Sequence, residues 1–152
     1  MNETIEYFGE CTAYSAKGHF KSADFRRLFT YTLIVVNIVV SIFSMIDLFN
    51  DMTIKIMGAF SLLASVLILM YQTKVEADYI SNSMKMGEEY LKLHNDIYVL
   101  FSSKRFSDTD VIEIKERVNK LNSKNKPAIS YVGKKWAKKS IEKNGEMKIW
   151  WK

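Results

Sequence analysis

The residues that most often carry chemistry in proteins are few in this chain. Cys11 is the only cysteine, and His19 and His94 are the only histidines. A single thiol cannot close a disulfide within the chain, and one thiol with two distant imidazoles offers neither a zinc ligand set nor a Cys–His nucleophile pair. The sequence also lacks the phosphate-binding patterns GxxxxGK[ST] and GxGxxG. We therefore expect a protein that is not an enzyme and that uses no metal and no cofactor.

A row of polar side chains inside an apolar run has a helical spacing that indicates helix packing or a pore instead of catalysis. At about 100° per residue, four of them share one helix face: Thr30, Asn37, Ser41 and Ser44. This row has two interpretations. It can be a packing surface on which the Asn37 amide bonds to another helix, or it can line a pore built from several copies. In a pore, Asp47 and Asp51 near the outer end would also be pore-lining and would favour cations.

A second apolar run carries its own face of small and polar residues, namely Gly58, Ser61 and Ser65. Ser61 and Ser65 are separated by three residues, which is the small-xxx-small spacing that lets helix backbones approach closely. We expect these three residues to form a helix-packing face. The other faces of both runs carry large apolar side chains that suit lipid.

Two apolar runs position these polar faces. The first extends from Leu28 to Phe49, about 22 residues or roughly 33 Å as a helix, and Asp47 is its only charged residue. The second extends from Ile54 to Tyr71, about 18 residues or roughly 27 Å. Each matches the ~30 Å hydrocarbon core of a bilayer. We expect a transmembrane hairpin in preference to a buried helical hairpin of a soluble protein.

The distribution of basic residues predicts how the hairpin is oriented. Basic residues flank its open end: Lys17, Lys21, Arg26, Arg27 and Lys74. The connection between the runs contains acidic but no basic residues. By the positive-inside rule, both termini are expected in the cytoplasm and the protein is expected to be multi-pass.

The last part of the chain is strongly basic. From Lys115 onward, twelve basic and three acidic residues give a net charge of +9, against +5 for the whole chain. A candidate ligand- or anion-binding segment is Lys134, Lys135, Trp136, Lys138 and Lys139. Anionic lipid, a nucleotide or oligonucleotide, or an acidic protein could bind there, and a solvated lysine surface is the alternative. Trp150 and Trp151 are expected at the membrane interface or in a subunit contact.

The remaining segments have helical periodicity and no convincing strand pattern, so the fold is expected to be all-α. We expect a helix at about 11–27, a long one after Tyr71, one at about 110–121 and one at about 127–143. Asp110 with Glu113 reads as an N-cap with its partner, and His94 reads as a packed, hydrogen-bonded residue. The expected domains are an N-terminal cytoplasmic helix (1–27), the transmembrane hairpin (28–71) and a cytoplasmic helical bundle for assembly and gating (72–152).

This layout resembles the bacterial SLATT family of two-transmembrane effectors, which are associated with SMODS-type nucleotidyltransferases and SLOG-type sensors. Three segments and the hairpin carry the resemblance, over about Ala13 to Lys139: "YSAKGHFKSADFRR", "YQTKVEADYISNSMKMGEEYLKLHNDIYVL" and "NKPAISYVGKKWAKK". The tail "EMKIWWK" lies outside it.

The resemblance implies a function in anti-phage defence. It implies a homo-oligomer, with a tetramer favoured, that permeabilises or depolarises the bacterial inner membrane in abortive infection. It also implies control by a nucleotide or oligonucleotide from a partner nucleotidyltransferase, which favours the pore interpretation of the polar row. The alternatives are a non-conducting membrane-anchored scaffold that recruits a cytoplasmic partner, and a holin-like protein that needs no ligand.

Overall fold

The computed structural model describes residues 2–44, 50–71, 73–104, 107–147 and 149–151, and within these ranges it contains five helices and no strand. They are α1 (Asn2–Ser44), α2 (Asp51–Tyr71), α3 (Lys74–Ser103), α4 (Asp108–Ser123) and α5 (Tyr131–Glu142). The described part of the chain is therefore all-α, as predicted. The packing of the chain divides it into two compact units, Met1–Asp24 with Tyr79–Lys152, and Phe25–Asp78.

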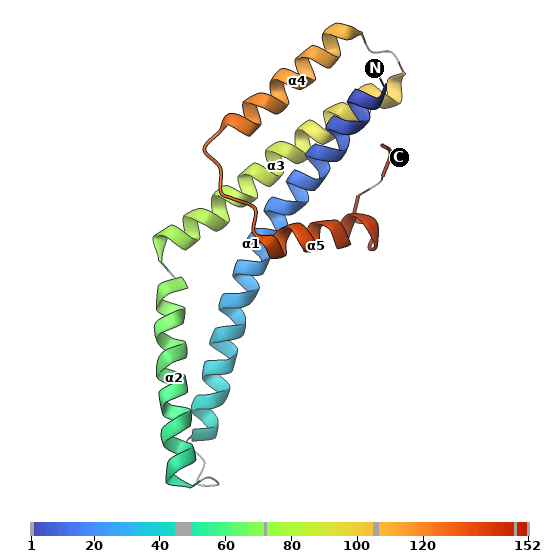
Figure 1. Cartoon of the computed structure of the whole chain (residues 1–152). Helices are drawn as coiled ribbons and strands as arrows, with labels where there is room; N and C mark the ends of the chain where they lie inside the picture. Colours follow the sequence, from blue (N-terminus) through green and yellow to red (C-terminus); the bar gives the residue numbers. More distant parts are fainter. Residues whose placement is uncertain (1, 45–49, 72, 105–106, 148, 152) are drawn as a thin grey trace. The chain divides into compact units, whose positions relative to one another are not determined.

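The first unit, which we call the helical bundle, has α1, α3 and α4 around a common core. Ile5 from α1 packs with Leu93 and Ile97 from α3 and with Ile114 and Val118 from α4. All five side chains are at most 6% exposed. Figure 1 shows α4 running beside α3 in this unit. The N-terminal residues expected as a separate helical domain thus pack with the C-terminal part of the chain.

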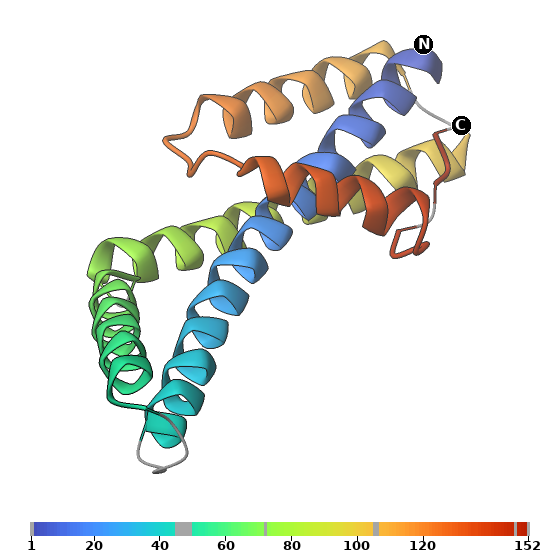
Figure 2. The ribbon, with the colours of Figure 1, turned by 60° about the horizontal axis from the view of Figure 1, so that its bottom comes forward.

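Helix α5 crosses the N-terminal half of α1 within the bundle, as both ribbon views show (Figures 1 and 2). The crossing is close because Gly133 has no side chain. A Cβ at this position would lie 2.1 Å from Ser22 Oγ and 3.0 Å from the Gly18 carbonyl oxygen. Ala137 and Ile141, on the same face of α5, are each only 1% exposed.

The helix starts differ from those predicted, because side-chain caps set them. Ser107, not Asp110, is the N-cap of α4, and its hydroxyl accepts a bond from the Asp110 N–H. The Asp110 carboxylate accepts the Ser107 N–H at 2.7 Å, which completes a capping box. The Ser130 hydroxyl accepts the Gly133 N–H and caps α5, so this helix begins at Tyr131 and not at Pro127.

The second unit is a hairpin in which α2 runs back alongside residues 25–44 of α1 (Figure 1). Arg26 and Glu76 form an ion pair of 2.7 Å in this unit. Both α1 and α2 are long and apolar enough to cross a membrane. Their most apolar 18-residue stretches are only 0% and 6% buried. Neither of these two stretches is therefore buried as a core by the single chain.

Candidate functional site

The polar residues of the hairpin meet between its two helices. The Asn37 amide donates to Ser65 Oγ at 3.0 Å, and Ser61 Oγ donates to Asn37 Oδ1 at 2.6 Å. The Ser41 and Ser61 hydroxyls are 3.1 Å apart. We call Asn37, Ser41, Ser61 and Ser65 the polar seam. Each of the four side chains is half-buried, so the seam bonds the helices to each other within one chain.

This geometry matches the packing interpretation for Asn37 and Ser41. The other two members of the predicted row bond to their own helix. Thr30 donates to the Arg26 carbonyl at 3.1 Å, and Ser44 donates to the Ser41 carbonyl at 2.8 Å. All four side chains of the predicted row therefore have hydrogen-bond partners within the chain, and none needs a pore to satisfy it.

The remaining predicted hairpin residues lie apart from the seam. Asp51 is exposed at the start of α2, whereas Asp47 lies outside the described residues. Gly58 was expected in helix packing with Ser61 and Ser65, but a Cβ there would meet no atom within 4 Å. That expectation is corrected for the single chain, because no neighbouring helix approaches Gly58 closely enough to require a glycine.

The predicted ligand segment lies on the outer side of α5. Lys134, Lys135, Lys138 and Lys139 are exposed, and Trp136 is half-buried. Lys134 and Lys138 line a shallow hollow of about 340 Å³ with Tyr14, Ser15, Ile129 and Ala137. The structure therefore does not bring the four lysines to one cavity, since Lys135 and Lys139 do not line this hollow.

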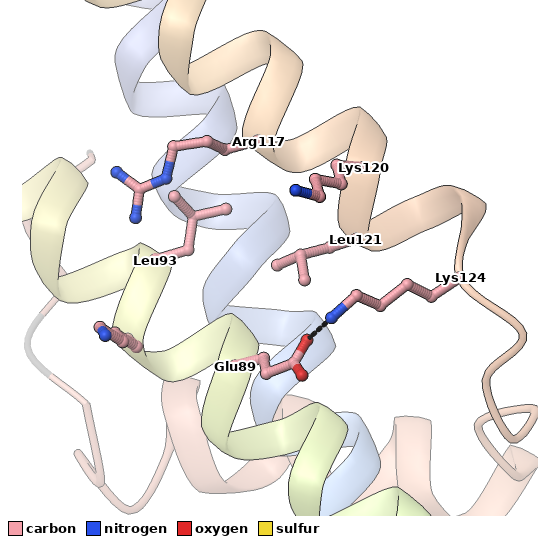
Figure 3. Close-up of a pocket in the computed structure, with 7 residues that line it drawn as sticks. Glu89, Leu93, Arg117, Lys120, Leu121 and Lys124 are labelled. Carbon is pink, nitrogen blue, oxygen red and sulfur yellow. Dashed lines mark hydrogen bonds and ion pairs between the residues drawn. The ribbon is translucent and has the colours of Figure 1, made fainter.

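A second basic site, which sequence reasoning missed, lies between α3 and α4. We call it the α3–α4 groove. It measures about 440 Å³ and has seven lining residues: Glu89, Lys92, Leu93, Arg117, Lys120, Leu121 and Lys124. Figure 3 shows Arg117 and Lys120 extending from α4 and Lys124 from the C-cap that follows it, with Leu93 and Leu121 between the helices. The spacing of Arg117, Lys120 and Lys124, which places one basic residue per turn on one face of α4, was the available signal.

Two ion pairs join the helices that form this groove. Lys124 Nζ lies 2.6 Å from the Glu89 carboxylate, and Arg117 pairs with Asp96. Among the described residues, no ion pair involves Lys92 or Lys120. Within the described part of the chain, the groove therefore holds two lysines that form no ion pair.

The tryptophan tail packs inside the bundle of its own chain, which corrects the expectation of a membrane-interface or subunit contact. Trp151 is 6% exposed and packs with Ala13 and Ile141. Trp150 lies against His94, with ring centroids 5.5 Å apart, and covers Gly9. The physical reason is that burying two indole rings in an available apolar site is more favourable than exposing them.

His94 is buried and hydrogen-bonded, which confirms its predicted packing role. Its Nδ1 lies 2.9 Å from the Gly9 carbonyl oxygen, and Trp150 Nε1 donates to its Nε2 at 3.3 Å. Burial lowers the pKa of His94 below its usual 6.5, although the bond to Gly9 opposes this effect. A neutral imidazole is the form that suits this site.

Glu146 fastens the tail segment to α1. Its carboxylate lies 2.9 Å from Lys17 Nζ and 3.3 Å from Lys21 Nζ. The bond from Lys17, with further bonds from Ser140 and Lys21, lowers the pKa of Glu146 to about 2. The group is partly exposed, so solvent screening limits the stability that these pairs contribute to less than about 1 kcal/mol each.

In the part of the chain that the structure describes, no group of three or more His, Cys, Asp or Glu side chains could hold a metal ion. The described surfaces include an apolar exterior on the hairpin and basic hollows on the bundle.

Comparison of the chain with protein-family models, with curated proteins and with solved structures gives no match.

Proposed function

We propose that this chain is a two-span membrane protein that assembles with copies of itself and permeabilises a bacterial inner membrane in anti-phage defence. The observation that carries the membrane part is the exterior of the hairpin. Large apolar side chains such as Leu62, Leu69 and Ile42 are 71%, 68% and 54% exposed. An aqueous environment would not tolerate so large an apolar surface in a single chain, whereas lipid and neighbouring copies would cover it.

In this proposal both termini are cytoplasmic, because basic residues flank the open end of the hairpin. Two helices cannot enclose a conduit, so conduction requires an oligomer, and the SLATT resemblance favours a tetramer. The same resemblance suggests that a nucleotide or oligonucleotide, made by a partner nucleotidyltransferase, controls the pore through the helical bundle.

A non-conducting membrane-anchored scaffold is the second candidate, and the polar seam favours it. Asn37 and Ser41 already form hydrogen bonds within the hairpin, so their polar groups do not need water in a pore as a partner. In this reading the spans only anchor the bundle, and the bundle recruits a cytoplasmic partner.

Membrane potential in bacteria that express the chain separates the two candidates. The informative variant is Thr30→Val/Ser44→Ala. Among the described residues, these hydroxyls bond to carbonyls of α1 itself, so their loss spares the seam. The matched control is Val39→Ala/Phe43→Leu, which changes two exposed apolar residues of the same helix. A pore predicts depolarisation by the wild type and the control and a weaker effect of Thr30→Val/Ser44→Ala at equal membrane abundance.

Two results would contradict the pore. One is a fully polarised membrane at high expression of the wild type together with the partner nucleotidyltransferase. The other is equal depolarisation by all three proteins, which would separate permeabilisation from the predicted polar row. If a variant chain that lacks the two spans still binds the cytoplasmic partner, that result would favour the scaffold.

A further inference from the structure

We infer that the α3–α4 groove is the binding site for a phosphate-bearing ligand of nucleotide size, in place of the α5 lysines that the sequence suggested. This inference rests on the nucleotide-responsive part of the proposed function and assigns it to named residues. Four basic residues line the groove, and only one acidic residue, Glu89, lines it with them.

The charge arrangement favours an anion. Lys92 on α3 and Lys120 on α4 lack carboxylate partners among the described residues, and both are exposed at the groove. Arg117 adds a planar guanidinium that can bond a phosphate in a bidentate manner. One phosphate group held between Lys92 and Lys120 would provide the negative charge that this part of the groove lacks.

The apolar residues and the size of the groove favour more than a bare phosphate. Leu93 is 2% exposed and Leu121 is half-buried, and the two lie between the basic side chains (Figure 3). Ligand pockets commonly measure about 300–1,000 Å³, and the groove measures about 440 Å³. A base or ribose can pack on Leu121, while Glu89 can accept a hydrogen bond from an amino or hydroxyl group.

A ligand in this groove would also act on the bundle. The ion pairs Lys124–Glu89 and Arg117–Asp96 hold α4 to α3. A phosphate that attracts Arg117 or Lys124 competes with those carboxylates, so occupancy changes how α4 is held. By contrast, the α5 lysines are exposed, and no ion pair among the described residues involves them.

Isothermal titration calorimetry of the purified full chain in detergent tests the assignment with ATP, pyrophosphate and adenosine as probes. The groove variant is Lys92→Glu/Lys120→Glu. The matched control is Lys134→Glu/Lys135→Glu, which makes the same change in net charge on α5. We expect ATP and pyrophosphate to bind, adenosine not to bind, and the groove variant to lose at least tenfold in ATP affinity while the control loses less than threefold.

Equal losses in both variants, a larger loss in the α5 variant, or equal binding of adenosine and ATP would each overturn the assignment. Lys92→Gln/Lys120→Gln, with its melting temperature measured, guards against loss of binding through misfolding. Because calorimetry needs no conduction, the site can be upheld even if the depolarisation experiment fails.

A second arm distinguishes a free ligand from a lipid headgroup. ATP is titrated into the chain in nanodiscs of phosphatidylcholine, with or without phosphatidylglycerol. Unchanged ATP affinity in both lipids supports a soluble ligand. A tenfold loss of ATP affinity in phosphatidylglycerol, seen in the wild type and in Lys134→Glu/Lys135→Glu alike, would mean that lipid phosphate fills the groove, and it would overturn the soluble-ligand assignment.

Discussion

Asn37 of α1 donates a hydrogen bond of 3.0 Å to Ser65 of α2, and this contact joins the two candidate membrane helices inside one chain. The hydrocarbon core of a bilayer provides no hydrogen-bonding groups, so polar side chains in a membrane span bond to one another or to backbone. The seam therefore explains why asparagine and serines occur in an otherwise apolar hairpin, whether or not the assembled protein conducts.

The first prediction concerns the strength of this contact. In a double-mutant cycle, Asn37→Ala and Ser65→Ala should show a coupling energy of about 0.6 kcal/mol and at most about 2 kcal/mol. The value is modest because Ser65 also bonds the Ser61 carbonyl at 2.9 Å and keeps a partner when Asn37 is lost. Unfolding in mixed micelles by titration with a denaturing detergent measures it.

The control cycle pairs Val39→Ala with Leu62→Ala, two exposed residues on α1 and α2. Its coupling should be close to zero. A coupling between Asn37 and Ser65 no larger than that of the control would mean that the two residues do not meet in the folded chain.

Much of the fold was predictable because it follows from local patterns. Apolar runs of span length, helical periodicity and the absence of strand patterns specified an all-α chain with a hairpin. The helix starts were less predictable, because several polar residues near each start compete for the cap. Both Ser107 and Asp110 can cap a helix, and the structure makes them N-cap and N3 of the same one.

The candidate sites were harder to predict because they depend on which helices become neighbours. The polar residues of the hairpin were found by spacing, but spacing could not decide whether they face a conduit or each other. Lys92 and Lys120 are 28 positions apart and form one groove only because α3 packs on α4. Likewise, the tryptophan tail has a site in its own chain because Gly9 leaves room for an indole ring.

The second prediction concerns the α4 cap. Ser107→Ala should destabilise the bundle by about 1 kcal/mol, because the Asp110 N–H loses its acceptor. Glu113→Ala, at the position that the sequence suggested as the cap partner, should change stability by less than about 0.5 kcal/mol because it is exposed. Thermal unfolding followed by circular dichroism compares the two, and the reverse ranking would restore Asp110 as the N-cap.

The third prediction tests the packing of Trp150 on Gly9. An added Cβ at Gly9 would lie 2.3 Å from Trp150 Cη2, so Gly9→Ala should displace the tail and cost about 1–3 kcal/mol. Gly58→Ala is the matched control, and it should be neutral or stabilising because its Cβ meets nothing and alanine favours a helix.

Combining Gly9→Ala with Trp150→Leu should recover part of this loss, since the smaller side chain leaves room for the methyl group. Tryptophan fluorescence and melting temperature report both effects. If Gly9→Ala melts at the wild-type temperature with an unchanged emission maximum, the tail does not pack on Gly9.

The fourth prediction is a pH dependence that arises at His94. The Gly9 carbonyl can only accept, so Nδ1 carries the proton, and Nε2 must be unprotonated to accept the Trp150 N–H. Protonation of Nε2 would place its N–H opposite the Trp150 N–H, so that two donors face each other, and it would bury a positive charge. The folded chain therefore resists protonation at His94, whose pKa is lowered, whereas the unfolded chain binds a proton below about pH 6.5.

Because the unfolded state binds more protons below that value, stability should fall as the pH drops below about 6.5 and stay level above it. The melting temperature measured from pH 8 to pH 5 should therefore decrease toward acid in the wild type. His94→Leu cannot titrate and should show a smaller decrease, while His19 is present in both proteins. Glu146, whose pKa is lowered to about 2 in the folded chain, is present in both proteins, so its contribution near pH 5 cancels in the comparison. If the melting temperatures of the two proteins fall equally between pH 8 and pH 5, His94 is not held in the neutral form, with its proton on Nδ1, that the contacts with Gly9 and Trp150 require.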